Sequence, residues 1–209
     1  MSGVLVMPPN GKAFAIISAS YTGDDLAKGE KYVQPLLNFG KPMTSSVEPR
    51  NYLKVQSAND GNLAAGRKYY MKSGFMDELS PEFTRDLVER FEPDNDRQNI
   101  VLMNQQAGAI ADLAPDATAY NHRAAQFDMM IGCVWDNPDH NEKNVAWGRD
   151  YFKAMSRYTT GYYVNNAMDE SANSVGNNYQ GNQDRLVELK NKYDPANQFR
   201  LNANILPTV

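Results

Sequence analysis

The chain has 209 residues, of which 42% are hydrophobic and 22% are charged, as in a globular protein rather than a disordered one. Its net charge is −4 and no run of Lys or Arg exceeds two residues, which argues against a nucleic acid or an anionic membrane as the partner. A single cysteine, Cys133, excludes an intrachain disulfide framework. Neither a membrane-spanning run nor a signal-peptide pattern is present, so we expect a cytoplasmic protein.

The first part of the chain alternates short apolar runs with segments of helical spacing. Residues 12–21 are apolar and partly β-branched, which predicts a buried strand. Apolar residues then recur at helical intervals until Gly40 and Pro42, which are typical of a helix end. A shorter helix is expected over residues 50–59, and residues 67–76 again predict a strand.

The remaining elements follow from similar patterns. Ser80-Pro81-Glu82 combines a capping oxygen, a first-turn proline and an acidic side chain, which predicts a helix start. The other expected elements are strands over residues 98–106, 126–135 and 161–166 and helices over residues 142–157 and 183–192. This order predicts an α+β fold with a mainly antiparallel sheet, helices packed on one face and ferredoxin-like β-α-β units.

The motifs of several common enzyme classes are absent. The sequence contains no GxGxxG or GxxxxGK[ST] phosphate loop and no GxSxG elbow. His122 and His140 lie far apart without neighbouring ligands at metal spacing, so no metal site is expected. Cys133 sits in an apolar run without a nearby histidine, which indicates a buried inert thiol. Residue chemistry alone therefore stops at a globular α+β domain.

A set of motifs near the end of the chain adds a more specific indication. Gly161-Tyr-Tyr-Val-Asn-Asn166 is followed by Asp169-Glu170, then by Tyr193-Asp-Pro-Ala-Asn-Gln-Phe-Arg200 and Asn202-Ala-Asn-Ile205. In this order and spacing they resemble the C-terminal region of the berberine-bridge-enzyme-like FAD-linked oxidoreductase family. Trp135 also falls where that family places a strand-ending tryptophan.

The resemblance implies a substrate-binding α+β domain over residues 1–160, with a berberine-bridge-like segment over residues 161–209 completing it. FAD would be held mainly by a separate FAD-binding domain, missing here or carried on another chain. The complete protein would oxidise an alcohol, amine or sugar carbon of a small-molecule substrate by hydride transfer to the flavin. This chain alone is expected to be inactive, and its uncovered apolar surface would favour a homo-oligomer.

The resemblance also implies residues that contact the cofactor. Tyr163 and Asn165 would lie beside the flavin, because an amide can both donate to and accept from its polar edge. Asn202 and Asn204 would lie at the interface with the FAD domain. The alternative interpretation makes Tyr163 a core residue, Asn165 a turn residue, and Asn202 and Asn204 polar surface residues.

The family's proton acceptor is not evident in this sequence. Asn166 stands where many members carry a tyrosine, and the strand position where plant members carry Gln or Glu falls at Met130 or Ile131. None of these side chains can act as a base at neutral pH. The candidate catalytic residues are therefore Tyr69, Tyr70 and Tyr163, and the candidate substrate-lining residues are Asn104, Gln105 and Asn166.

Two other functions stay open at this stage. The chain could be a non-catalytic binding or interaction domain that keeps the fold without redox chemistry, which the asparagine at position 166 favours. It could also be a cofactor-free enzyme with a tyrosine-lined cleft.

Overall fold

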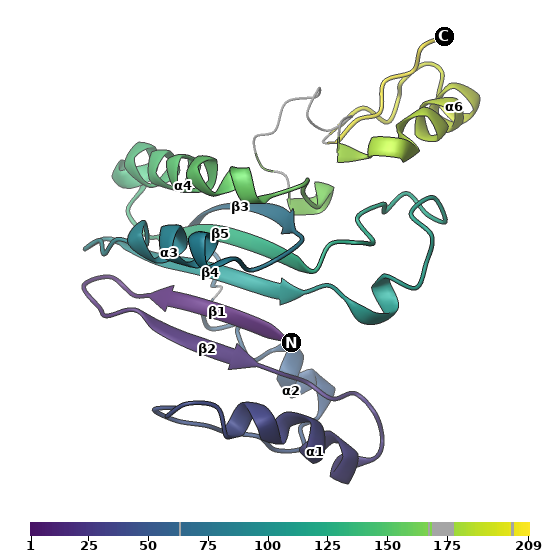
Figure 1. The fold of residues 1–209 in the computed structure, drawn as a ribbon. Coiled ribbons are helices and arrows are strands. Elements are labelled where there is room, and N and C mark those ends of the chain that lie inside the picture. Colours follow the sequence, from purple (N-terminus) through teal and green to yellow (C-terminus); the bar gives the residue numbers. More distant parts are fainter. Residues whose placement is uncertain (63, 167, 169–177, 202) are drawn as a thin grey trace.

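The computed structural model describes residues 1–62, 64–166, 168, 178–201 and 203–209. Its centre is one five-stranded sheet in the order β2-β1-β4-β5-β3, in which every neighbouring pair is antiparallel (Figure 1). The strands are β1 (Ser2–Met7), β2 (Phe14–Ser18), β3 (Lys68–Met76), β4 (Arg97–Gln105) and β5 (Phe127–Trp135). The predicted α+β class with an antiparallel sheet is confirmed.

The longer helices begin and end where the sequence predicts. They are α1 (Leu26–Leu37), α3 (Pro81–Glu89), α4 (Asn141–Met155) and α6 (Gln183–Tyr193), and α2 (Tyr52–Gln56) is a shorter one. Ser80 caps α3, since its Oγ accepts a hydrogen bond from the Phe83 N–H at 3.1 Å. Asp25 caps α1 in the same way, through the Lys28 N–H at 3.0 Å.

The main core lies between one face of the sheet and the helices α3 and α4. Side chains alternate between the faces of a strand, so Val101 on β4 and Met129 and Ile131 on β5 share this helix-covered face. Phe83 and Leu87 of α3 and Tyr151 and Met155 of α4 pack against them. The opposite side of the sheet, here called the second face, carries the intervening residues of each strand.

A second cluster extends this core toward the other end of α4. Tyr70, Cys133 and Trp135 are buried there beneath Trp147. Gly148 allows α4 to lie close to Tyr70 on β3, because a Cβ atom at this position would lie 2.6 Å from the Tyr70 ring. The Arg97 guanidinium stacks 4.2 Å from the centre of the Trp147 ring, which closes this end of the core.

Three segments differ from the sequence prediction. The strand over residues 12–21 was expected to be buried, but it is limited to β2, whose five residues are all exposed at the edge of the sheet. The strand expected over residues 161–166 is wrong: it is reduced to one bridge between Gly161 and Phe75, and residues 164–166 form a 3₁₀ turn. The asparagine-rich sequence favours such a turn over a continuous ladder. Conversely, β1 is a strand that the sequence analysis did not predict, and it occupies the middle of the sheet beside β4.

In the part of the chain that the structure describes, no helix has both the length and the apolar character needed to cross a membrane. At the edge of the molecule, α6 and the chain that follows it lie away from the sheet (Figure 1), and Asn182 and Arg185 bond to backbone carbonyls of residues 115–118.

Candidate active site

A row of hydrogen-bonding side chains crosses the second face of the sheet. Ser2 pairs with Asn104 across β1 and β4, and Asn104 pairs with Asp128 across β4 and β5. Directly paired residues of an antiparallel sheet project from the same face, so the three side chains lie side by side. The Ser2 Oγ donates to the Asn104 Oδ1 at 2.7 Å. We call Ser2, Asn104 and Asp128 the polar row.

Asp128 is the unusual member of the polar row. Its side chain is 7% exposed, and its Oδ1 makes no hydrogen bond within the described residues. Burial disfavours the charged form and raises the pKa of this carboxyl to about 6. The Ser73 hydroxyl, on the same face of the neighbouring strand β3, is likewise buried without a described partner. This part of the face therefore holds unsatisfied polar atoms of the kind that a bound molecule satisfies.

An aromatic wall borders the polar row. Phe75 pairs directly with Asp128 across β3 and β5, and the His122 ring stacks on Phe75 with centroids 4.5 Å apart. Tyr120 packs edge-on against Phe75 at 5.8 Å and lies 6.3 Å from Tyr163. Burial and then the nearby Asp128 charge raise the pKa of Tyr120. The four rings Phe75, Tyr120, His122 and Tyr163 thus form a continuous surface beside one acidic group.

His122 builds this wall rather than performing chemistry. Its Nε2 lies 3.0 Å from the Asn178 carbonyl oxygen, and burial lowers the pKa of its imidazole. A Cβ atom at Gly161 would meet the His122 ring, so glycine is required where the chain passes it. Asn178 also bonds to both backbone groups of Tyr162, which fixes the segment that carries Tyr163.

Tyr163 and Asn165 lie at the outer edge of the wall. Tyr163 is 38% exposed, and the Asn165 Nδ2 donates to its hydroxyl at 2.6 Å. This bond uses the amide nitrogen and leaves the Asn165 Oδ1 as an acceptor on an exposed side chain. Asn166 follows in the same turn, and its N–H bonds to the Tyr163 carbonyl at 2.8 Å.

The two tyrosines proposed on β3 lie on different faces. Tyr70 is 4% exposed in the cluster with Cys133 and Trp135, on the helix-covered face. Tyr69 is on the second face, but it lies six residues along β3 from Phe75, a distance of about 20 Å. Its hydroxyl bonds to the Ala64 carbonyl at 3.2 Å. The structure therefore brings neither tyrosine to the polar row or to Tyr163.

The remaining predicted site residues are scattered. Asn104 is in the polar row, whereas Gln105 projects from the other face at the exposed end of β4. Asn204 lies in the segment after α6, half-buried, and its Oδ1 has no hydrogen bond to any described residue. Asn202 lies outside the described residues.

The Tyr193–Arg200 motif has a structural role. The Asp194 carboxylate accepts hydrogen bonds from the N–H groups of Gln198 at 2.7 Å and Phe199 at 3.0 Å, and it pairs with Lys190. The Lys190 bond, with the two backbone bonds, lowers the pKa of Asp194. The motif thus folds the tail back onto α6, as expected for a turn-forming sequence.

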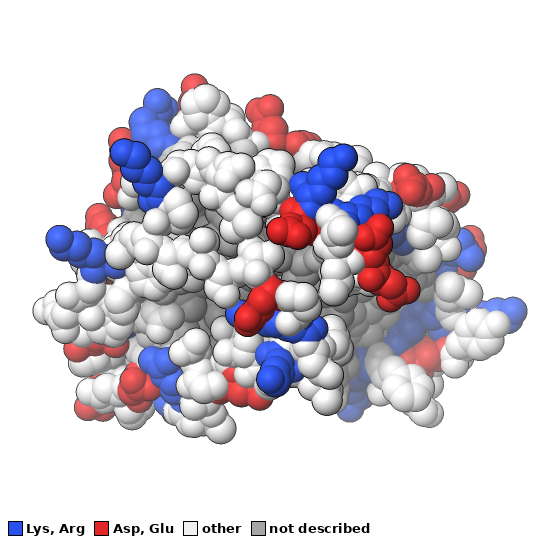
Figure 2. Space-filling view, turned by 90° about the horizontal axis from the view of Figure 1, so that it is seen from below, with Lys and Arg blue, Asp and Glu red and all other residues white. Residues whose placement is uncertain are grey.

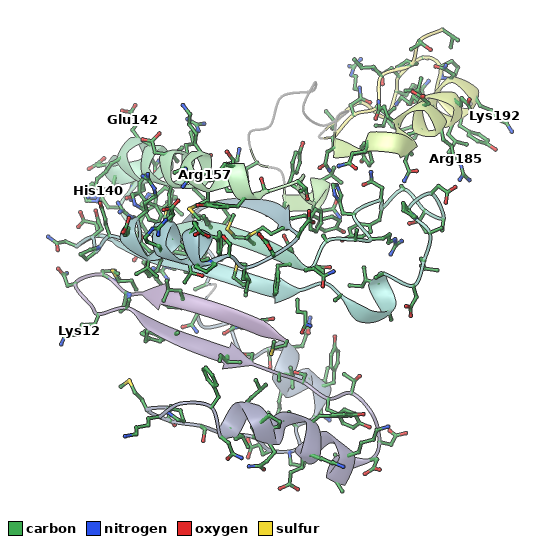
Figure 3. The ribbon with its side chains drawn as sticks, in the orientation of Figure 1. Lys12, His140, Glu142, Arg157, Arg185 and Lys192 are labelled. Atoms are coloured by element: carbon green, nitrogen blue, oxygen red, sulfur yellow. The ribbon has the colours of Figure 1, made fainter. Side chains whose placement is uncertain are left out.

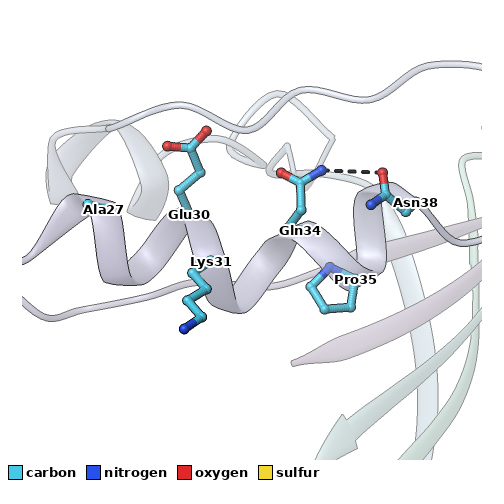
Figure 4. Close-up of a pocket in the computed structure, with 6 residues that line it drawn as sticks. All are labelled: Ala27, Glu30, Lys31, Gln34, Pro35 and Asn38. Carbon is cyan, nitrogen blue, oxygen red and sulfur yellow. Dashed lines mark hydrogen bonds between the residues drawn. The ribbon is translucent and has the colours of Figure 1, made fainter.

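Other parts of the molecule offer weaker sites. No cluster of three or more metal-ligating side chains occurs among the described residues. His140 and the labelled charged residues Lys12, Arg157, Arg185 and Lys192 lie at the periphery (Figure 3). A shallow hollow of about 470 Å³ runs along α1, lined by the exposed side chains shown in Figure 4. It holds no buried polar group, so the second face remains the better candidate.

Comparison with known proteins shows what the chain resembles. Residues 125–206 match the family model described as berberine and berberine like. An FAD-linked oxidoreductase of Dictyostelium discoideum is 22% identical over 99% of this chain and 45% of its own length. The FAD-linked oxidoreductase YgaK of Bacillus subtilis is 28% identical over 85% of this chain and 40% of its own length.

The last two fifths of the chain thus match the berberine and berberine like family model, and most of its length is similar to FAD-linked oxidoreductases. Its fold agrees: the solved structure of BBE-like #28 from Arabidopsis thaliana superposes with a TM-score of 0.79 at 18% identity, over the whole chain and half of the other protein. Aclacinomycin oxidoreductase superposes with a TM-score of 0.76 at 17% identity. The chain spans less than half the length of the curated relatives described above.

Within this berberine-bridge-like chain, the sequence analysis missed Asp128. A signal was present, because Asp128 is the single charged residue in the apolar run of β5 and an acidic side chain is seldom buried without a purpose. The assigned roles of Tyr163, Asn165, Asn202 and Asn204 remain predictions; the structure supplies positions for all of these residues except Asn202, which lies outside the described residues.

Proposed function

We propose that this chain forms the substrate-side surface of an FAD-dependent oxidoreductase, with the polar row and the aromatic wall as its substrate site. The observation that carries the proposal is Asp128, a buried carboxyl without a described partner on its Oδ1, on the face of the sheet opposite the helices. Similarity to FAD-linked oxidoreductases supplies the class of reaction.

Asp128 would act as the proton acceptor. FAD, when bound, supplies the acceptor for a hydride from the substrate carbon. The Asp128 carboxylate takes the proton from the hydroxyl or amine nitrogen on that carbon, so that a C=O or C=N bond can form. With its pKa at about 6, the group is mostly ionised at neutral pH and is still a stronger base than an ordinary aspartate.

The neighbours of Asp128 would position the substrate. The Ser2 hydroxyl donates to the Asn104 Oδ1, which fixes the orientation of that amide and leaves its Nδ2 available to donate to a substrate oxygen. The rings of Tyr120 and Tyr163 would stack against an apolar or ring-shaped part of the substrate. This arrangement suits an alcohol, amine or sugar carbon next to an apolar group.

Tyr163 and Asn165 would contact the cofactor, and most of the FAD would be held elsewhere. The exposed Asn165 amide and the Tyr163 ring lie at the outer edge of the aromatic wall, and this small contact would leave most of the FAD to be held elsewhere. We therefore propose that a separate FAD-binding domain, on a longer polypeptide or on another chain, faces the second face of the sheet.

An FAD titration tests whether a separate domain holds most of the FAD. FAD absorbance and fluorescence are followed with this chain alone, with the FAD-binding part of the Bacillus subtilis relative YgaK alone, and with an equimolar mixture. We expect no binding by this chain alone and tighter binding in the mixture than in the FAD-binding part by itself. Tight binding by this chain alone would contradict this proposal.

A further inference from the structure

The sheet contains two units with the same order of elements. The C-terminal unit runs β3-α3-β4-β5-α4, and its last strand, β5, lies between β4 and β3. The N-terminal unit runs β1-β2-α1, which matches the last three elements of the other, β4-β5-α4. The units meet where β1 pairs antiparallel with β4. By this correspondence β2 is the counterpart of β5, and counterparts of β3 and α3 are not among the described elements.

The two counterpart strands have opposite surroundings. On β5, every residue from Met129 to Trp135 except Met130 is buried. On β2, all five residues are exposed, including Phe14 and Ile16 on one face and Ile17, 54% exposed, on the other. Among the described strands, β2 pairs only with β1, so its outer backbone groups have no strand beside them there.

β2 also lacks the features that protect natural edge strands. Such strands carry charged side chains, prolines or bulges that prevent further pairing. The sequence of β2, FAIIS, contains none of these residue types and has high β-propensity. It is the sequence of an interior strand placed at an edge.

The helix that follows β2 is equally uncovered. Only Gly29 and Val33 of α1 are buried, whereas Leu26 and Tyr32 are more than half exposed. α4, its counterpart, packs on β5 and β3 through Tyr151 and Met155. Figure 1 shows α1 beyond β2 at the edge of the sheet, and Figure 2, which views the molecule from this side, shows broad uncharged stretches between scattered charges.

We propose that β2 is an interior strand of the complete sheet and receives, on its open edge, an antiparallel β-strand followed by a helix, the counterparts of β3 and α3. The repeated order specifies this occupant, because β3 pairs antiparallel with β5 on the corresponding edge. The curated relatives are more than twice as long as the part this chain spans, which leaves room for a strand and a helix. The inference rests on the proposed function in one respect: the strand and helix that would pair with β2 are taken to belong to a longer FAD-binding enzyme.

A matched pair of substitutions tests this surface. Ile17→Lys places a charge on the exposed strand β2, and Val88→Lys places one on the outer side of α3, where Val88 is 60% exposed. Both are made in this chain alone and in a longer enzyme in which this chain replaces the matching region of the Bacillus subtilis relative YgaK. In this chain, each should change the Tm by less than about 2 °C.

In the longer enzyme, Ile17→Lys should lower the Tm by about 5 °C or more while Val88→Lys remains neutral. The β2 amides that do not bond to β1 should also exchange with deuterium at least about tenfold more slowly there than in this chain. Equal Tm values for the longer enzyme and its Ile17→Lys variant would overturn the proposal.

Sedimentation velocity of the longer enzyme separates the alternative occupant. A dimer of the longer enzyme that Ile17→Lys converts to monomer would assign the edge to a second copy and overturn the proposal, whereas an assembly state that Ile17→Lys leaves unchanged supports it. These readouts do not use turnover. If the longer enzyme failed to bind FAD but Ile17→Lys still lowered its Tm, the proposed function would fail and the sheet completion would stand.

Discussion

The two units of the sheet share an order of elements but differ in how completely they are packed. In the C-terminal unit, α3 and α4 cover β4, β5 and β3, and the buried side chains of all these elements meet in one core. In the N-terminal unit, β2 is exposed along its whole length and α1 buries two residues. The comparison shows that element order alone does not make a stable unit, because each helix needs two strands beneath it to bury its apolar face.

The difference also explains where the candidate site lies. Asp128 can be held without a described partner on its Oδ1 because the strands on both sides of it belong to the packed unit. Burying a carboxylate costs free energy, and the packing of the core in the C-terminal unit offsets this cost. The N-terminal unit has no comparable core. Ser2, at the start of β1, is the contribution of the N-terminal unit to the polar row.

The largest expected difference between the units is in the response to isoleucine truncation. Ile131→Ala on β5 should lower the free energy of unfolding by about 3–4 kcal/mol, because the buried side chain leaves a cavity. Ile17→Ala on the counterpart strand β2 should lower it by less than about 0.5 kcal/mol in this chain. Urea unfolding measures both, and equal losses would break the comparison.

The next effect is a pH-dependent stabilisation by Asp128→Asn. The folded-state pKa of about 6 is higher than the unfolded value, so the folded protein loses stability as the pH rises from about 4 to about 6. At pH 7.5 this group costs up to about 3 kcal/mol, which the amide avoids.

Asp128→Asn should therefore raise the Tm at pH 7.5 and have little effect at pH 4. Asp150→Asn, on the exposed side of α4, is the control and should leave the Tm unchanged at both pH values. Thermal unfolding at a series of pH values measures this, and a gain that did not vary with pH would show that Asp128 is not buried as a charged group.

A smaller difference is expected between two helical glycines. A Cβ atom at Gly148 of α4 would lie 2.6 Å from the buried Tyr70 ring, so Gly148→Ala should lower the free energy of unfolding by about 1–3 kcal/mol. A Cβ atom at Gly29 of α1 meets Tyr21 at the same distance, but Tyr21 is partly exposed and can move aside.

Gly29→Ala should therefore be neutral, or stabilising by up to about 1 kcal/mol through helix propensity. Urea unfolding of the two variants compares the packing of α4 and α1 directly. A loss at Gly29 as large as that at Gly148 would show that α1 is packed as tightly as α4.

Much of the packed unit could be predicted from the sequence. β5 has a long apolar run and α3 has a clear cap and a first-turn proline. With β3, β4 and α4, these elements lie within a few residues of the expected ranges. β1 was not predicted. Residues 161–166 were assigned to a strand because their aromatic and β-branched residues outweighed the two asparagines that close the turn.

The candidate site was less predictable, because it depends on which face of a strand each residue occupies. Tyr69 and Tyr70 are adjacent in sequence but project to opposite sides of β3. Asp128 gains its importance from neighbours on β3 and β4 that are distant in sequence. Strand pairing brings these groups together, and no single-strand pattern specifies that pairing.

The most direct test of the account is the rate of flavin reduction by Asp128→Asn in the longer enzyme with FAD bound. The enzyme is mixed anaerobically at pH 7.5 with a panel of alcohols, sugars and amines, and the loss of flavin absorbance is followed beside wild type and Asp150→Asn. We expect Asp128→Asn to slow reduction about 10²–10⁴-fold with its FAD content unchanged. The wild-type rate should fall below a pH of about 6. Reduction of Asp128→Asn at the wild-type rate would contradict the assignment of Asp128 as the proton acceptor.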